Sequence, residues 1–154
     1  MSEKLILPNE FLAVAEEELK NGKSVKILAD GTSMYPFIHG GKDFTEIVPL
    51  NEKEGLVRWN AYFFNYNGKY IIHRFIEEDG DKLVMMGDGN IAIQERVDRN
   101  NVIGTLKYIH SFKGATIDCT TTKWRRTGKI WHKLKPTRRY LLALIRRMER
   151  YGII

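Results

Sequence analysis

A serine in a short turn is the first residue whose surroundings suggest chemistry. Ser33 lies in the run GTSMYP, two residues after the strand-like run SVKIL. The glycine and proline beside it favour a sharp turn that presents the hydroxyl to solvent. A serine becomes a nucleophile only when an adjacent base takes its proton and backbone N–H groups stabilise the oxyanion. Taken alone, a serine in such a turn most often hydrogen-bonds its own backbone.

Three further motifs follow this serine along the chain. His73 lies in the apolar run YIIHRFI, Asp88 in the run GDGN, and the run NVIG comes next at residues 101–104. A strand histidine by itself is most often a hydrogen-bonded structural residue. The run GDGN is equally well explained as a tight turn whose carboxylate binds nearby amides. These motifs gain a functional meaning only when they are considered together with Ser33.

In this order, GxSMxP, HRFI, GDGN and NVIG resemble the signal peptidase I and SOS-repressor superfamily of serine peptidases, over about residues 24–108. The resemblance implies that fold and an endopeptidase activity. It makes Ser33 the nucleophile and His73 the general base, as in the archaeal and endoplasmic-reticulum branch; the bacterial branch usually has lysine there. His73 would accept the hydroxyl proton and later protonate the leaving amine. The Ser33 amide is the first oxyanion donor that we expect.

The third catalytic residue is where this sequence departs from the family pattern. The branch with a histidine base places its orienting aspartate about six residues beyond the Asp of the GDGN motif, and that position is Gln94 here. Asp88 itself is our first candidate for the acid, and Glu95 is the second. A triad without its acid loses rate, because the acid orients the imidazole and stabilises its charged form.

The resemblance also indicates how a substrate would bind. The family accepts an extended peptide with small side chains near the cut, and strand addition to a sheet edge is the physical mode that we expect. Gly31, Thr32 and Met34 are the candidate substrate-binding residues, with Met34 lining the pocket.

The elements that must position these residues are mostly β-strands. A short helix is expected at about residues 9–21, and strand-like runs separated by turn residues then continue to about residue 117. Asn67-Gly68 and Asp79-Gly80 predict two hairpins that place His73 on the middle strand of a meander. We therefore predict a mainly β fold, an antiparallel sheet or coiled barrel of the signal-peptidase type, within a peptidase domain of residues 1–122 whose core is 24–117.

Residues 123–154 form a basic extension. The net charge of the chain is +6, although residues 123–150 hold eleven Lys or Arg against the single acid Glu149, so the preceding body is mildly acidic. From Pro136 onward the spacing predicts an amphipathic helix whose apolar face holds Leu141, Leu144, Ile145 and Met148. That face either packs on the body with the arginines in solvent, or binds a membrane surface or an acidic partner. A basic stretch alone argues too weakly for a nucleic-acid partner.

Cysteine content and hydropathy suggest a location. Cys119 is the single cysteine, so no intramolecular disulfide can form, and a reducing cytoplasm fits best. Acidic residues 16–18 interrupt any apolar segment of residues 1–22, so we expect neither an export signal nor a membrane anchor. We predict a cytoplasmic protein that can lie peripherally at the inner membrane surface. The remaining histidines show no metal-ligand spacing, and we predict no metal and no cofactor.

Three functions remain open from the sequence. The first is a serine endopeptidase that trims a precursor or leader peptide. The second is a non-catalytic or partner-dependent module that keeps the peptidase fold to bind an extended peptide. Gln94 at the position expected for the acid suggests this alternative. The third is a regulator that cleaves itself, which requires a scissile segment able to reach Ser33.

Overall fold

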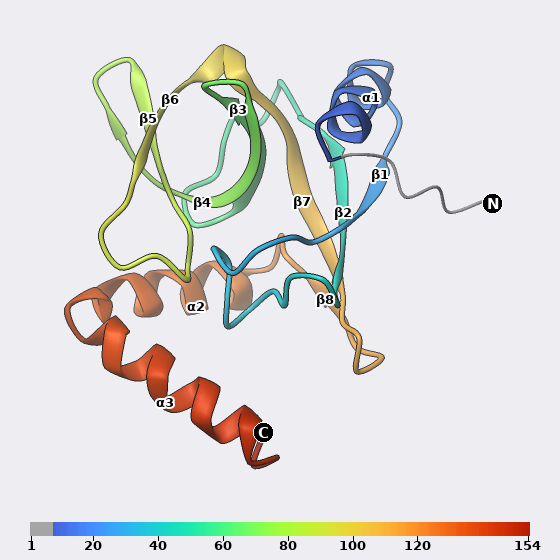
Figure 1. The fold of residues 1–154 in the computed structure, drawn as a ribbon. Helices are drawn as coiled ribbons and strands as arrows, with labels where there is room; N and C mark the ends of the chain where they lie inside the picture. The colour runs from blue at the N-terminus through green and yellow to red at the C-terminus, as the bar shows by residue number, and fades with distance from the viewer. Residues whose placement is uncertain (1–7) are drawn as a thin grey trace.

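The structure, a computed structural model, describes residues 8–154 (Figure 1). It is mainly β, with one helix before the strands and two after them. The helices are α1 (Pro8–Lys20), α2 (Thr122–Lys133) and α3 (Arg138–Arg150), with short 3₁₀ turns at Arg99–Asn101 and Lys135–Thr137. The strands are β1 (Val25–Leu28), β2 (Phe44–Pro49), β3 (Ala61–Tyr66), β4 (Lys69–Asp79), β5 (Lys82–Met86), β6 (Glu95–Asp98), β7 (Val102–His110) and β8 (Thr116–Asp118).

All the strands belong to one antiparallel sheet of order β1-β2-β7-β3-β4-β5-β6, with β8 pairing to the far half of β7. The sheet curls into a half-barrel (Figure 1). Long β7 forms its centre, since β2 pairs along one edge of it and β3 pairs with the start of the other. The mainly β, antiparallel part of the fold prediction is therefore confirmed.

The two predicted hairpins are present on either side of β4. Asn67 and Gly68 both have positive φ angles, 52° and 82°, in the two-residue turn that the Tyr66–Lys69 pair closes. Backbone of this kind twists with the flanking strands, which is why Asn-Gly favours it. β4 consequently lies between β3 and β5, and His73 falls on the middle strand of the meander, as predicted.

The C-terminal segment folds as two helices, whereas the sequence predicted one. Pro136 lies in the 3₁₀ turn before α3, and α3 begins at Arg138. α2 was missed because Lys and Arg outnumber its apolar residues, so the run was interpreted only as a basic segment. A local signal for its start does exist, since the Thr121 hydroxyl caps the helix by accepting a hydrogen bond from the Trp124 N–H at 3.1 Å.

Both C-terminal helices lie below the half-barrel in the view of Figure 1, and residues of both pack on the loop after β1. Trp124 of α2 lies in one buried cluster with Met34, Ile38 and Leu106. Trp131 and Leu142, from α2 and α3, enclose Tyr35 in another. Burial of side chains of this size stabilises a fold by about 1.5–3 kcal/mol each. The residues that follow Ser33 therefore pack partly against the C-terminal helices.

Within residues 8–154, no helix combines the length and the apolar character needed to cross a membrane. The prediction that the N-terminus lacks an export signal depends partly on residues 1–7, which lie outside the described residues.

Candidate active site

Ser33 lies in the loop of residues 29–43 between β1 and β2. This loop folds back on itself, because the Gly41 N–H donates to the Ala29 carbonyl at 2.7 Å and a Cβ at Gly40 would collide with the Gly31 carbonyl. Gly31 has a φ of 72°, which favours glycine. The loop leaves Gly31 and Thr32 exposed and Ser33 half-buried, so the sequence expectation of a tight turn around the serine is met.

The main chain of Ser33 is held by the loop of residues 87–90, which follows β5. The Gly89 N–H donates to the Ser33 carbonyl at 2.8 Å. A Cβ at Gly87 would collide with that same carbonyl, and a Cβ at Gly89 would collide with the Thr32 carbonyl. The two glycines of the GDGN motif thus permit a close backbone approach to the serine loop.

His73 is buried and is oriented by a carboxylate. Its Nδ1 forms a short hydrogen bond with Oε1 of Glu95, the first residue of β6, and both side chains are almost fully buried. Because a carboxylate only accepts, Nδ1 carries a proton, and in the neutral imidazole Nε2 then holds the lone pair. This is the tautomer that a general base requires.

The free nitrogen of His73 faces the serine loop. Nε2 is buried and has no hydrogen-bond partner among residues 8–154, so it is not bonded to the Ser33 hydroxyl. A Cβ at Gly87 would lie 2.8 Å from Nε2 while colliding with the Ser33 carbonyl. His73 Nε2 and the main chain of Ser33 therefore meet at the same glycine.

Of the two candidate acids, the structure brings Glu95 to His73 and leaves Asp88 elsewhere. Asp88 receives two hydrogen bonds from Arg74, from Nε at 3.0 Å and from Nη2 at 2.7 Å. The sequence ranked Asp88 before Glu95 as the partner of His73. In the structure Glu95 contacts His73, and Asp88 contacts Arg74. Arg74 is fully buried and follows His73 directly, so it faces the opposite side of β4.

Met34 also lies elsewhere than expected. Its side chain is buried in the core cluster with Ile38 and Trp124 rather than lining an open surface, and its sulfur accepts a weak hydrogen bond from the Asp88 N–H at 3.5 Å. The residue after Ser33 turns inward because the loop needs an apolar anchor beneath it. Gly31 and Thr32 remain accessible to a ligand.

The C-terminal helix α3 contacts the serine loop through the only acid of the basic extension. Glu149 accepts a hydrogen bond from the Tyr35 hydroxyl at 2.6 Å, and its other oxygen lies 2.7 Å from His39 Nε2. Burial, with the neighbouring Glu149, raises the pKa of Tyr35 to about 12. Burial opposes the ionisation of Glu149, but the hydrogen bonds from Tyr35 and His39 outweigh it and lower its pKa.

Among residues 8–154, neither the cysteine nor a cluster of metal-ligand residues provides a second candidate site. Burial raises the pKa of Cys119 to about 12, so its thiol stays protonated and is a poor nucleophile. Among residues 8–154, no three His, Cys, Asp or Glu side chains are grouped so as to hold a metal ion.

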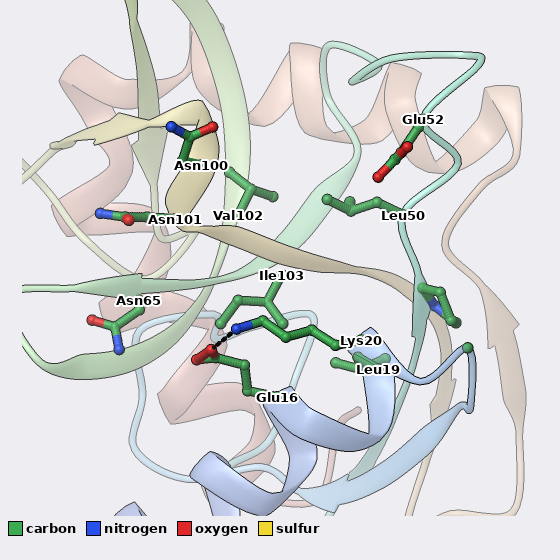
Figure 2. Close-up of a pocket in the computed structure, with 12 residues that line it drawn as sticks. Glu16, Leu19, Lys20, Leu50, Glu52, Asn65, Asn100, Asn101, Val102 and Ile103 are labelled. Atoms are coloured by element: carbon green, nitrogen blue, oxygen red, sulfur yellow. Dashed lines mark ion pairs between the residues drawn. The ribbon is translucent and has the colours of Figure 1, made fainter.

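An open pocket of about 570 Å³ lies between α1 and the strand ends near Pro49 and Asn101 (Figure 2). Of its charged residues Glu16, Lys20 and Glu52, the first two pair with each other at 2.9 Å. Ser33, His73 and Glu95 take no part in lining it. None of the predicted catalytic residues therefore lines this pocket.

The fold and the site define a curled antiparallel half-barrel that carries a serine loop beside a carboxylate-bound histidine. No protein-family model matches the chain, and no curated protein or solved structure shows significant similarity to it. The function is therefore inferred from the geometry and from the order of the motifs.

Proposed function

We propose that the chain is a serine endopeptidase of the signal-peptidase type, with Ser33 as nucleophile, His73 as general base and Glu95 as the acid that orients it. One observation carries the proposal. His73 binds a buried carboxylate through Nδ1 while its unpaired Nε2 faces the glycine that abuts the Ser33 main chain. A buried histidine nitrogen without a hydrogen-bond partner destabilises the fold, so its presence calls for an explanation such as a catalytic role.

The reaction follows from this arrangement. As the Ser33 Oγ attacks the peptide carbonyl, Nε2 of His73 takes the hydroxyl proton, and Glu95 stabilises the resulting imidazolium. The same proton passes to the leaving amine as the C–N bond breaks, which leaves an acyl-serine that water hydrolyses. The Ser33 hydroxyl must turn toward Nε2 when the substrate binds, as catalytic hydrogen bonds often tighten only in the complex.

The sheet topology supports an extended peptide as the substrate. Among residues 8–154, β1 is an edge strand that pairs with β2 alone, and the serine loop follows it directly. A peptide that adds to the free edge of β1 would be led toward Ser33, past exposed Gly31 and Thr32. Trimming of a precursor or leader peptide is the reaction that this geometry suits.

Labelling with an active-site-directed serine acylating probe, read by intact mass, tests the proposal. We expect one adduct on the wild type and none on Ser33→Ala or His73→Ala. Ser24→Ala is the matched control, since Ser24 is an exposed serine outside the site, and it should label like the wild type. The absence of an adduct on folded wild type would contradict the proposal.

A second candidate is a peptide-binding module that lacks catalysis. The missing hydrogen bond between the Ser33 hydroxyl and His73 Nε2 favours it. In that case Ser33→Ala would leave the cellular role of the protein unchanged, and no acyl adduct would form.

We further propose that the outer face of α3 binds an anionic membrane surface from the cytoplasmic side. Tyr140, Leu144 and Tyr151 are 72%, 54% and 71% exposed and recur on one side of the helix. Leu144 was expected on the packed face together with Leu141 and Ile145, but that face holds Leu142 beside those two residues. The helix therefore has apolar residues on both sides, and exposed arginines flank the outer set, a composition typical of interfacial helices.

A further inference from the structure

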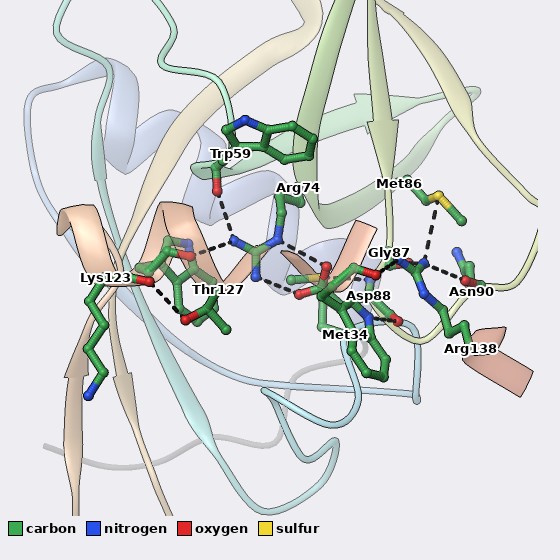
Figure 3. Close-up of polar contacts among 12 residues, drawn as sticks. Met34, Trp59, Arg74, Met86, Gly87, Asp88, Asn90, Lys123, Thr127 and Arg138 are labelled. Carbon is green, nitrogen blue, oxygen red and sulfur yellow. Dashed lines mark hydrogen bonds and ion pairs between the residues drawn. The ribbon is translucent and has the colours of Figure 1, made fainter. Parts of the chain in front are cut away.

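The C-terminal helices donate hydrogen bonds to the carbonyls of the loop that holds Ser33, residues 87–90 (Figure 3). The indole N–H of Trp131 donates to the Asp88 carbonyl at 2.7 Å. Arg138 Nη1 donates to the Asn90 carbonyl at 2.7 Å and more weakly to the Gly87 carbonyl at 3.5 Å. A segment that the sequence suggested to be an appendage thus supplies the partners of this loop.

Arg138 is placed there at a cost. It is the first residue of α3 and only 1% exposed, and burial lowers its pKa, with Asp88 opposing that effect. Its guanidinium also donates to the Trp131 carbonyl at 3.2 Å and lies over the Trp131 ring. Burying a charge is unfavourable unless its hydrogen bonds are satisfied, and here backbone carbonyls satisfy most of them. The position of these carbonyls is therefore coupled to the start of α3.

The same loop is fixed from its other side by β4. Arg74 pairs with Asp88 through two hydrogen bonds and donates to the Trp59 carbonyl at 2.8 Å (Figure 3). The loop then fixes the catalytic groups, because Gly89 donates to the Ser33 carbonyl and Gly87 lies against His73 Nε2. Between β4 and the C-terminal helices, the loop has little freedom to shift.

We propose that Arg138 is a positioning residue of the peptidase site, and that α2 and α3 complete this site by holding residues 87–90 against Ser33. This inference rests on the proposed function. Loss of Arg138 would let the loop move, and a displacement of about 1 Å at a catalytic group can cost on the order of a hundredfold in rate. Probe binding would change little, since the Arg138 side chain is buried and offers a probe almost no surface.

Two measurements on Arg138→Ala test the proposal: the concentration dependence of Ser33 acylation, and exchange of the Gly89 amide hydrogen by NMR. We expect the limiting acylation rate to fall by about ten- to a hundredfold with a nearly unchanged half-saturating probe concentration, and Gly89 exchange to accelerate. Arg138→Lys, which keeps the charge and a single donor nitrogen, should recover part of both. Arg139→Ala, at the exposed neighbouring position, should match the wild type.

The inference would be overturned if Arg138→Ala acylated at the wild-type rate and its Gly89 amide exchanged as slowly as in the wild type. If that variant does not fold, Trp131→Phe removes the indole donor and keeps the ring, and unchanged acylation and protection there would overturn it equally. If the wild type itself takes no label, the peptidase proposal fails, and Gly89 exchange alone then decides whether Arg138 positions the loop.

Discussion

At the scale of single residues, the contact between Glu95 and His73 explains how the site can lack an acid at position 94. β6 alternates, so Glu95 and Val97 are buried while Arg96 and Asp98 are exposed. Gln94 precedes the strand and is exposed. An acid one residue later along the chain reaches the histidine because strand register, and not the count of residues from Asp88, decides which side chain faces inward.

Glu95→Gln should lower the acylation rate of Ser33 by about a hundred- to ten-thousandfold, because an amide can donate to Nδ1 and favour the wrong imidazole tautomer. Circular dichroism would check that the variant is folded. The matched control is Gln94→Ala, where we expect a rate within about twofold of the wild type because the side chain is exposed. A Glu95→Gln protein that acylates normally would show that Glu95 has only a structural role.

At the scale of elements, α2 packs directly against the Arg74 side chain of β4. Gly128 of α2 lies against the Arg74 guanidinium, and a Cβ there would collide with Nη1. Arg74 cannot easily move aside, since it is fully buried and bonded to Asp88 and to the Trp59 carbonyl. Glycine at this position lets α2 pack onto the buried ion pair.

Gly128→Ala should therefore destabilise the protein by about 1–3 kcal/mol, as overpacking of an interior does. In a free helix the same change would be stabilising by about 1 kcal/mol, because alanine is the better helix former. The midpoint of urea unfolding measures the difference. Lys129→Ala, at the exposed next residue, should have little effect. A Gly128→Ala protein that is more stable than the wild type would show that α2 does not pack as described.

At the scale of the whole molecule, the C-terminal extension combines an excess of positive charge with exposed apolar side chains. The extension contacts the body through its inner face and through Glu149, and its outer face carries Tyr140, Leu144 and Tyr151 beside arginines. The packing of this helix and its proposed membrane contact are therefore compatible, since they use opposite sides.

We expect the protein to sediment with vesicles that contain phosphatidylglycerol and to remain unbound with pure phosphatidylcholine, and binding should weaken with salt. Replacing Tyr140, Leu144 and Tyr151 together by serine should abolish binding. Val14→Ser, which removes an exposed apolar residue on α1, is the control that should bind normally. Binding to both vesicle types alike, or to neither, would contradict an anionic-surface role.

Much of the fold could be read from local patterns. The antiparallel strands, the Asn67-Gly68 hairpin and the place of His73 on the middle strand followed from alternation and turn residues. The strand runs and the hairpin turns depend on neighbours a few residues apart, so the sequence alone indicates them. The sequence order of the motifs likewise singled out Ser33 and His73.

Only the tertiary structure decided which charged groups meet. Asp88 pairs with Arg74, Glu95 reaches His73, and Arg138 crosses from the C-terminal helix to the loop at residues 87–90. Each contact joins segments from 14 to 48 residues apart. Such pairings depend on strand register and on the packing of helices against the sheet, which no local pattern of residues encodes.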